Sequence, residues 1–550
     1  MVVRMRWLTL FGMRRSTARP AWMLFLIIFS ALYLSHITLL RLPYYWDEAG
    51  YYIPAAWDFY RTGSLIPITT LSNAHPPLPS IYLALCWRLA GFSPEVTREA
   101  VLLVAALAIF AVWCLAQRLV AAPSVAFWTA TLTALYPIWF AQSSLAHADI
   151  FAAACTLWGL VFALPPGKRN PYLACIWFTL AALSKETSIC VPAALALYRI
   201  GEGCPMPALE RRRSLSESAW LLASALPLAG WYAWHFAKTG FLFGNPEFLR
   251  YNAQATLTPV RFLAALVHRL LHLTAHMNLF VLVSMALAAL LLPVQNARNG
   301  AARPGMDVKV QRLIVWLLFA NAVFFSVLGG ALLTRYLLPM YPLVILLAVF
   351  HLFQRAPAWH ALAAVAAGAF VIGLFVNPPY GFAPEDNLQY ARITRMEMAA
   401  IARLTADYSG ATVASAWPVT DELTRPELGY VAQPFRVYAL EDFTAPQIDR
   451  AAANRGQFTM ALVFSTKYDP PSPLFTLGPR SRALDQRYFG LHQDLSSEEI
   501  ATRLGGSLIW KRTDQGMAVA LIRMNSQPQT AVDSPPLRSS ALRISSVHHL

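Results

Sequence analysis

The sequence predicts an all-α polytopic membrane domain followed by a small α/β domain outside the membrane. Of its 550 residues, 57% are hydrophobic and only 13% are charged, whereas a soluble domain usually carries about 25% charged residues. Apolar segments of membrane-spanning length recur as far as residue 376. Beyond that point the chain becomes polar, and short strand-like segments replace the long apolar runs.

The first predicted span follows a basic segment, residues 1–20, which we expect in the cytoplasm. The apolar run Ala21–Leu40 is longer than the core of a signal peptide and long enough to cross the bilayer. It therefore predicts a helix that remains in the membrane. We expect the membrane domain to cover residues 21–376.

Ten more apolar stretches bring the predicted number of spans to eleven. They lie at about 100–118, 124–141, 150–165, 171–183, 187–199, 218–235, 276–294, 313–333, 336–354 and 358–376. A weaker segment, Leu78–Ala90, is too short to span the bilayer. If it does not cross, the cluster Arg211–Arg213 falls on the inner side, as the positive-inside rule requires. We therefore expect an interfacial or re-entrant helix there, with the N-terminus inside and the C-terminal region outside.

Residues 377–525 are predicted to form the α/β domain on the outer face. Residues 385–404 have helical spacing, and Thr513-Asp514-Gln515-Gly516 suits a hairpin turn. The predicted strands are Thr412–Ala416, Phe458–Phe464, Leu508–Lys511 and Met517–Ile522. The tail, residues 526–550, is rich in Ser, Pro and Gln, and we expect it to be disordered.

The first outer loop, residues 41–77, contains two adjacent carboxylates and a histidine among aromatic side chains and prolines. Asp47 and Glu48 directly follow the first span, where a partly desolvated carboxylate can serve as a general base. Alternatively, the acid pair caps the next helical turn. Prolines on its C-terminal side hold His75 at the membrane surface, either as a site residue or as part of a simple turn.

Three more ionisable residues lie at the outer ends of predicted spans. Asp149 would begin a helix, as a cap or as a site residue. Lys185 interrupts two apolar runs, where a charge costs roughly 2.5–3.5 kcal/mol, so it needs a partner or a function. The neighbouring Glu186 could supply that partner. Arg335 has no acidic neighbour in sequence; it suits bidentate phosphate binding, or it snorkels to the interface.

The predicted topology places all these groups on the outer face of the membrane. The loop 236–261, which carries Lys238, Arg250 and Tyr251, falls on the same side. Acids and bases thus converge at one membrane surface, as expected for a site that binds an anionic substrate and moves a proton.

Four segments resemble the protein O-mannosyltransferase and lipid A aminoarabinose transferase superfamily, a branch of the GT-C membrane glycosyltransferases. They are Trp46-Asp47-Glu48-Ala49, His75-Pro76-Pro77-Leu78, Asp149 and Arg335-Tyr336-Leu337-Leu338-Pro339. Their order and spacing extend the resemblance over residues 20–376. Members take a sugar from a polyprenyl-phosphate donor at the outer face and pass it to a glycan, lipid or protein acceptor.

The resemblance also implies roles for individual residues. It makes Asp47 the catalytic acid/base candidate, with Glu48 helping to shape the catalytic site. The substrate and the donor phosphate would be held by His75, Asp149, Lys185, Arg250, Arg335 and Tyr336. No cofactor is required, because cationic side chains can stabilise a leaving phosphate. A divalent metal is also compatible, since carboxylates and histidine are suitable ligands.

Other function classes fit the sequence less well. A net charge of +15 suggests nucleic acid, but the basic residues form short clusters between apolar runs, as in cytoplasmic loops. A transporter or flippase of a lipid-linked anion predicts charges near the membrane midplane and inverted repeats, and we find neither in the sequence. A receptor-like anchor hardly needs eleven spans. We therefore expect a multi-pass glycosyltransferase in a cell inner membrane, and the compact loops suit a bacterium.

Overall fold

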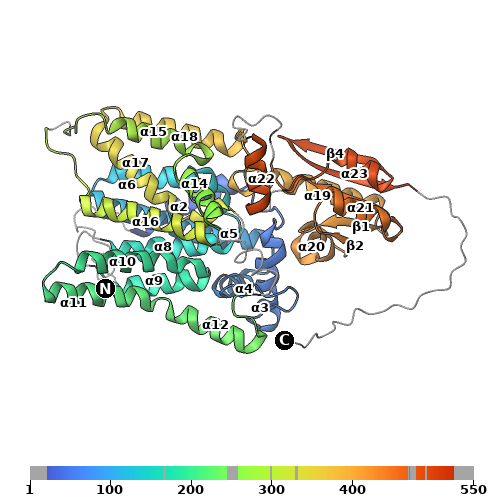
Figure 1. Cartoon of the computed structure of the whole chain (residues 1–550), viewed down its shortest axis with the longest axis horizontal. Helices are drawn as coiled ribbons and strands as arrows, with labels where there is room; N and C mark the ends of the chain where they lie inside the picture. The colour runs from blue at the N-terminus through green and yellow to red at the C-terminus, as the bar shows by residue number, and fades with distance from the viewer. Residues whose placement is uncertain are drawn as a thin grey trace, which may run out of the picture.

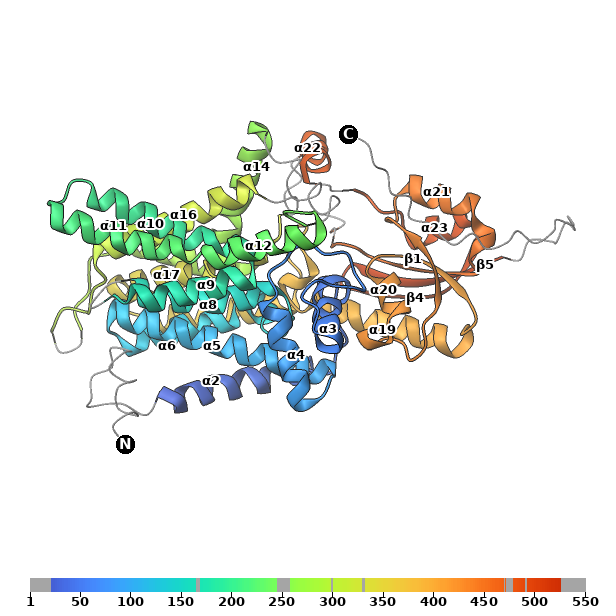
Figure 2. The same cartoon turned by 90° about the horizontal axis from the view of Figure 1, so that it is seen from below.

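A computed structural model of the chain shows a long helical bundle with a smaller sheet-containing domain at one end (Figures 1 and 2). It describes residues 21–164, 169–244, 258–297, 300–328, 332–468, 470, 478–489 and 492–525. The predicted cytoplasmic segment 1–20 and disordered tail 526–550 lie outside these residues.

Most helices of the bundle run roughly along the long axis of the molecule. They are α2 (Ala21–His36), α5 (Pro94–Val120), α6 (Pro123–Leu135), α8 (Ala148–Ala163), α9 (Pro171–Ser184), α10 (Cys190–Gly203), α11 (Ala208–Ala223), α12 (Leu226–Thr239), α14 (Pro259–Thr274), α15 (Leu279–Ala289), α16 (Val308–Val327), α17 (Tyr341–Arg355) and α18 (Trp359–Phe375). Alanine, leucine and aromatic side chains from α5, α8 and α17 form much of the buried core.

The predicted number of eleven spans is not confirmed. By length and composition, three of the described helical segments can cross a membrane: Pro94–Val120, Pro259–Ala289 and Val308–Val327. Six shorter apolar helices accompany them. Prolines shorten some predicted spans: the stretch 124–141 is split into α6 and α7 (Pro137–Gln142), because Pro137 removes a helical hydrogen bond.

Short helices lie between the bundle and the C-terminal domain. The predicted interfacial helix is α4 (Leu78–Ala90), with the expected bounds, and it packs beside α3 (Ile53–Thr62) (Figure 2). The described start of α2 and the start of α11, which carries Arg211–Arg213, lie at the opposite end of the bundle. The interfacial helix and the basic cluster thus lie at opposite ends of the bundle, as the charge pattern predicts. Which end faces the cytoplasm stays a prediction.

The C-terminal domain is built on one five-stranded mixed sheet. Its strands are β1 (Thr412–Ala416), β2 (Arg436–Leu440), β3 (Met460–Phe464), β4 (Gly506–Asp514) and β5 (Met517–Met524). The order is β2-β1-β3-β5-β4; β1 is parallel to β2 and β3, and β5 is antiparallel to β3 and β4. The helices of the domain are α19 (Gln389–Asp407), α20 (Val419–Thr424), α21 (Ala445–Ala453), α22 (Gly478–Phe489) and α23 (Ser497–Leu504).

Four of these strands were predicted, and β2 was not. The short β2 contains an exposed Arg436 and only one fully buried residue, so it lacks a clear apolar alternation. The predicted hairpin turn joins β4 to β5, and the positive φ angles of Gln515 and Gly516 explain the glycine there.

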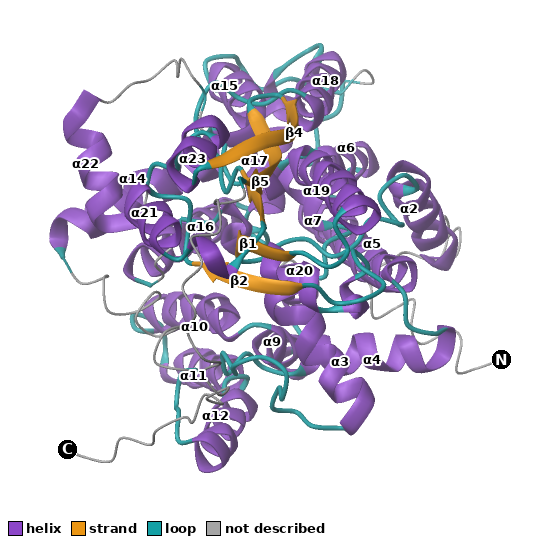
Figure 3. Ribbon diagram, turned by 90° about the vertical axis from the view of Figure 1, so that its right-hand side faces the viewer, coloured by secondary structure: helices purple, strands orange, loops and turns teal. Residues whose placement is uncertain are grey.

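The sheet domain is fixed to the bundle by a shared apolar cluster. This cluster joins the inner faces of the sheet and α19 to Leu39, Leu42, Tyr45, Phe140 and Leu374 of the membrane domain. Figure 3 shows the sheet in front of the end of the bundle. The carboxyl end of β1 and helix α20 are thereby held against the first outer loop.

Candidate functional site

A single π-helical turn, η2 (Glu48–Tyr52), carries the first predicted site residue. The N–H of Ile53 donates to the carbonyl of Glu48, five residues earlier. Such turns often mark functional sites. Glu48, Ala49 and Gly50 point inward and are buried, while Asp47 at the start of the turn and Tyr51 and Tyr52 at its end are more accessible. The turn thus aligns one carboxylate with two aromatic rings.

Glu48 is completely buried behind this turn. Its two oxygens accept hydrogen bonds from Arg98 at 2.7 and 2.9 Å, from the N–H of Ala146 at 2.6 Å and from the N–H of Tyr45 at 2.9 Å. Since protein donors occupy the carboxylate, Glu48 cannot reach a substrate. We therefore correct its predicted catalytic role to that of a positioning residue, which fixes its neighbour Asp47.

Arg335 is the centre of the site. It lies in a short 3-10 turn, η6 (Thr334–Leu337), and its side chain is only 3% exposed. Its guanidinium forms ion pairs with Asp47, with Glu385 at 2.6 Å and with Asp149 at 3.5 Å. The predicted alternative, a snorkelling arginine, is wrong, because the side chain turns inward to these carboxylates.

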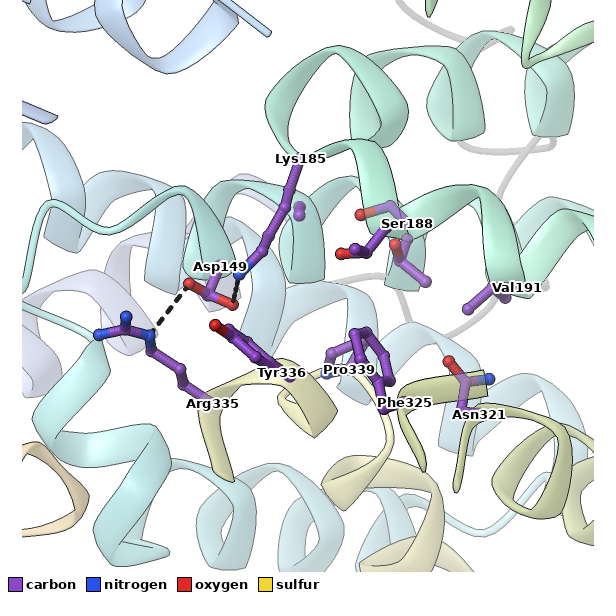
Figure 4. A pocket seen from close by; sticks show the side chains of 12 residues that line it. Asp149, Lys185, Ser188, Val191, Asn321, Phe325, Arg335, Tyr336 and Pro339 are labelled. Carbon is purple, nitrogen blue, oxygen red and sulfur yellow. Dashed lines mark hydrogen bonds and ion pairs between the residues drawn. The ribbon is translucent and has the colours of Figure 1, made fainter. Parts of the chain in front are cut away.

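Lys185 adds a second cation next to Arg335 (Figure 4). Its ammonium group lies 2.5 Å from an oxygen of Asp149 and 4.1 Å from the ring centroid of Tyr336. Asp149 therefore joins the two cations. The predicted alternative, a contact between Lys185 and Glu186, does not supply the partner of Lys185.

Glu385 is a site residue that the sequence analysis missed. It lies in η7 (Pro384–Asp386), after α18, the last helix of the bundle. Burial raises the pKa of Glu385 to about 8, with a further rise from Asp47, although Arg335 opposes it. One signal was available: the Glu385-Asp386 pair follows the last span as Asp47-Glu48 follows the first.

His147 completes the cluster and was also missed as a site residue. Its Nδ1 lies 2.9 Å from the side-chain oxygen of Gln142 and 3.3 Å from Arg335. Its ring packs 5.8 Å from Tyr52. The sequence motif Ala146-His147-Ala148-Asp149 contained the residue, but its burial depends on the fold.

His75 lies beside this cluster and pairs with Glu186. Its Nδ1 is 3.1 Å from a Glu186 oxygen, and its ring stacks on Tyr52 at 5.9 Å. Although burial opposes it, the contact with His75 lowers the pKa of Glu186 to about 2. Glu186 is thus a carboxylate that holds His75 in place.

A cavity opens onto the two cations, and its empty space, part of which is open to solvent, is about 310 Å³. Asp149, Lys185, Arg335 and Tyr336 line one part of it (Figure 4). The remainder is lined by apolar and uncharged polar side chains: Ala152, Val191, Phe325 and Pro339, with Thr156, Thr187, Ser188 and Asn321. Cationic groups in one part and uncharged, partly apolar side chains in the other suit a phosphate attached to a hydrocarbon chain.

The structure thus brings together most of the predicted site. Asp47, Asp149, Lys185, Arg335 and Tyr336 form one cluster, and His75 adjoins it through Tyr52. Arg250 lies outside the described residues. Among the residues that the structure describes, no group of three or more His, Cys, Asp or Glu side chains is arranged to hold a metal ion.

Comparisons with known proteins give a family match over part of the chain and a similar fold. Residues 74–234 match the family described as dolichyl-phosphate-mannose-protein mannosyltransferase, a segment that includes His75, Asp149 and Lys185. No curated protein sequence matches the chain.

Two solved structures share the fold. The apo structure of ArnT from Cupriavidus metallidurans has a TM-score of 0.53 at 14% identity, over 91% of this chain and 98% of that one. The same protein bound to undecaprenyl phosphate has a TM-score of 0.52 at 15% identity, over 92% and 98%. The likeness covers both the helical bundle and the C-terminal domain.

Proposed function

We propose that this chain is a GT-C membrane glycosyltransferase, which transfers a sugar from a polyprenyl-phosphate donor to an acceptor outside the membrane. The family match over residues 74–234 and the fold shared with ArnT support the proposal. One observation carries the proposal: two buried cations, Arg335 and Lys185, line a cavity with a partly apolar wall, and Arg335 pairs there with the partly exposed carboxylate of Asp47. The resemblance favours a mannose-like or aminoarabinose-like sugar and an inner-membrane location with the C-terminal domain outside.

The cavity supports the choice of donor. Arg335 presents a planar fork of N–H groups that suits phosphate oxygens, and Lys185 adds a point charge. The apolar wall formed by Val191 and Phe325 would receive the first isoprenyl units. The related fold of ArnT has been solved with undecaprenyl phosphate, a lipid of this class.

Donor binding would release the catalytic base. In the structure Arg335 is paired with Asp47, so the Asp47 carboxylate is neutralised. A donor phosphate competes for the same guanidinium and would free Asp47 to accept a proton. The proposal therefore requires the donor to bind before the acceptor, which steady-state kinetics can test.

The reaction would be a single displacement. Asp47 takes the proton of the acceptor hydroxyl as its oxygen attacks the anomeric carbon. The bond between that carbon and the phosphate oxygen breaks, and the electron pair leaves with the lipid phosphate. Arg335 and Lys185 stabilise the charge that develops there. No step needs a metal, and this stays a prediction for an assay with and without EDTA.

The experiment is an assay of purified protein in detergent with labelled polyprenyl-phosphate sugars. We expect consumption of one donor and loss of that activity in Asp47→Asn, by a factor of about 10² to 10⁴ for a lost general base. Asp407→Asn is a matched control, because Asp407 pairs with Arg403 on the surface of α19. Full activity of folded Asp47→Asn would refute the role of Asp47.

The same assay separates an enzyme from a transporter. Detergent removes the compartments that transport needs, so donor consumption there establishes catalysis. A folded protein that consumes no donor from a broad panel would instead favour a flippase or transporter of a lipid-linked anion.

A further inference from the structure

A second pocket, here called the second cavity, lies beside the first outer loop, and its empty space, part of which is open to solvent, is about 540 Å³. Its walls come from residues 51–80 and from Ala148. Ala148 lines this cavity and the adjacent Asp149 lines the cation-bearing one, so the two cavities meet at the start of α8. Tyr52 stands between them: it lines the second cavity, stacks on His75 and lies near Asp149 and Arg335.

The second cavity differs from the first in charge. None of the described residues that line it is Lys, Arg, Asp or Glu. Its polar groups are the side chains of Tyr51, Tyr52, Thr70, Ser72, Asn73, His75 and Ser80. Arg425 does not line it; its Nη2 donates to the Thr69 carbonyl at 2.9 Å, and its Nε lies 3.2 Å from Asp421. Such a lining suits neutral hydroxyl groups and offers an anionic group no strong cation.

An aromatic surface borders this cavity. Tyr51 is 36% exposed, and its ring centroid lies 5.6 Å from that of Trp417, which follows β1 in the C-terminal domain. The close approach of Trp417 requires Gly50, because a Cβ there would lie 2.4 Å from the Trp417 ring. The C–H face of a pyranose is apolar, so its burial against an aromatic ring is favourable.

We propose that the second cavity is the acceptor site and that it takes a neutral pyranose of a glycan. This inference rests on the proposed function. The acceptor ring would pack against Tyr51 beside Trp417, and its reacting hydroxyl would point past Tyr52 toward Asp47 at the start of the same π turn. The C-terminal domain thereby acquires a role, because it supplies Trp417 to acceptor recognition.

The test uses the full-length protein in lauryldimethylamine oxide, because glucoside and maltoside detergents carry the ring that the site is proposed to bind. The probes are octyl β-glucopyranoside, octyl α-mannopyranoside and the 6-phosphate of each. Binding is followed without donor by saturation-transfer NMR of the pyranose protons. Transfer is followed with the labelled donor that the first assay identifies.

We expect saturation transfer to the neutral glycosides and a KM about tenfold or more lower for them than for their 6-phosphates. Tyr51→Ala should raise the acceptor KM about tenfold and leave the donor KM unchanged, and Tyr51→Phe should retain binding. Trp417→Ala should act in the same direction. Tyr172→Ala is the control, since Tyr172 is an exposed aromatic residue on α9.

The outcomes separate the two proposals. Better use of the 6-phosphates, or an unchanged acceptor KM in Tyr51→Ala, would overturn the acceptor site while donor consumption still supports the glycosyltransferase. Glycoside binding that depends on Tyr51 without consumption of any donor would retain the neutral-sugar site and overturn the proposed reaction.

Discussion

The guanidinium of Arg335 binds the carboxylate of Asp47, although 288 residues separate them in sequence. The pair joins the loop after the first membrane helix to the turn before one of the last. It also joins the two proposed halves of the chemistry, because one partner would take a proton and the other would hold the leaving phosphate. In the proposed reaction, donor binding and base activation would therefore be coupled through one side chain.

Arg335→Lys should weaken donor use. Lysine keeps the charge but loses the planar fork that contacts three carboxylates, so we expect the donor KM to rise about tenfold or more. The measurement is initial rate against donor concentration, with the thermal unfolding midpoint as a check of folding. An unchanged donor KM would count against a phosphate role for Arg335.

Glu48→Gln should destabilise the protein strongly. The change leaves Arg98 buried without its carboxylate, which typically costs about 3–5 kcal/mol. The surface pair Arg503–Asp449 is the matched control, and Asp449→Asn should cost about 0–1 kcal/mol. The readout is the midpoint of thermal unfolding; similar losses in the two variants would contradict the positioning role.

Gly50→Ala should disturb the contact between the π turn and Trp417. The new methyl group overlaps the indole ring, and overpacking of this kind usually costs about 1–3 kcal/mol. The double variant Gly50→Ala/Trp417→Ala should recover stability but not acceptor use. Gly230→Ala, where a Cβ meets nothing within 4 Å, is the control. Equal stability of Gly50→Ala and Gly230→Ala would show that this contact is not close.

Glu397→Gln should change the pH dependence of stability. Burial in the C-terminal domain raises the pKa of Glu397 to about 8 from 4.5. The folded chain therefore keeps a proton that the unfolded chain releases between these values, so stability falls as pH rises, by up to about 1.4 kcal/mol per unit.

The readout is the thermal midpoint at pH 5.5, 6.5 and 7.5, and the variant should show a flatter profile than the wild-type protein. Glu499→Gln is the control, because the lowered pKa of Glu499 places its titration below this range. A slope that Glu397→Gln leaves unchanged would place the titrating group elsewhere.

The sequence predicted where helices lie better than it predicted which helices span the membrane. Leu78–Ala90 was predicted with its bounds, because its apolar run is short and lies between prolines and Gly91. The stretch 218–235 was predicted as one span but is divided between α11 and α12, since Pro227 interrupts the hydrogen-bond ladder. Single prolines and glycines set such helix boundaries, and hydropathy averaged over a window does not detect them.

The sequence predicted several residues of the site but not the contacts between them. Charge placement and the resemblance selected Asp47, Asp149, Lys185 and Arg335, and all four are in contact. Glu385 and His147 were missed because their contacts with Arg335, 50 and 188 residues away in sequence, form only in the folded chain. Glu48 was assigned to catalysis because sequence adjacency to Asp47 cannot show that its side chain points the other way.

The sequence by itself determined the apolar, helical character of the N-terminal part, the mixed C-terminal domain and the gathering of charged groups at one end of the helical bundle. These follow from hydropathy, side-chain period and charge bias, which are local properties of the chain. Only the tertiary structure decided which charges pair, which carboxylate stays accessible and how the two cavities meet at Tyr52. Such relations depend on long-range packing, because the energy of a charge in a protein is set by its burial and its neighbours in space.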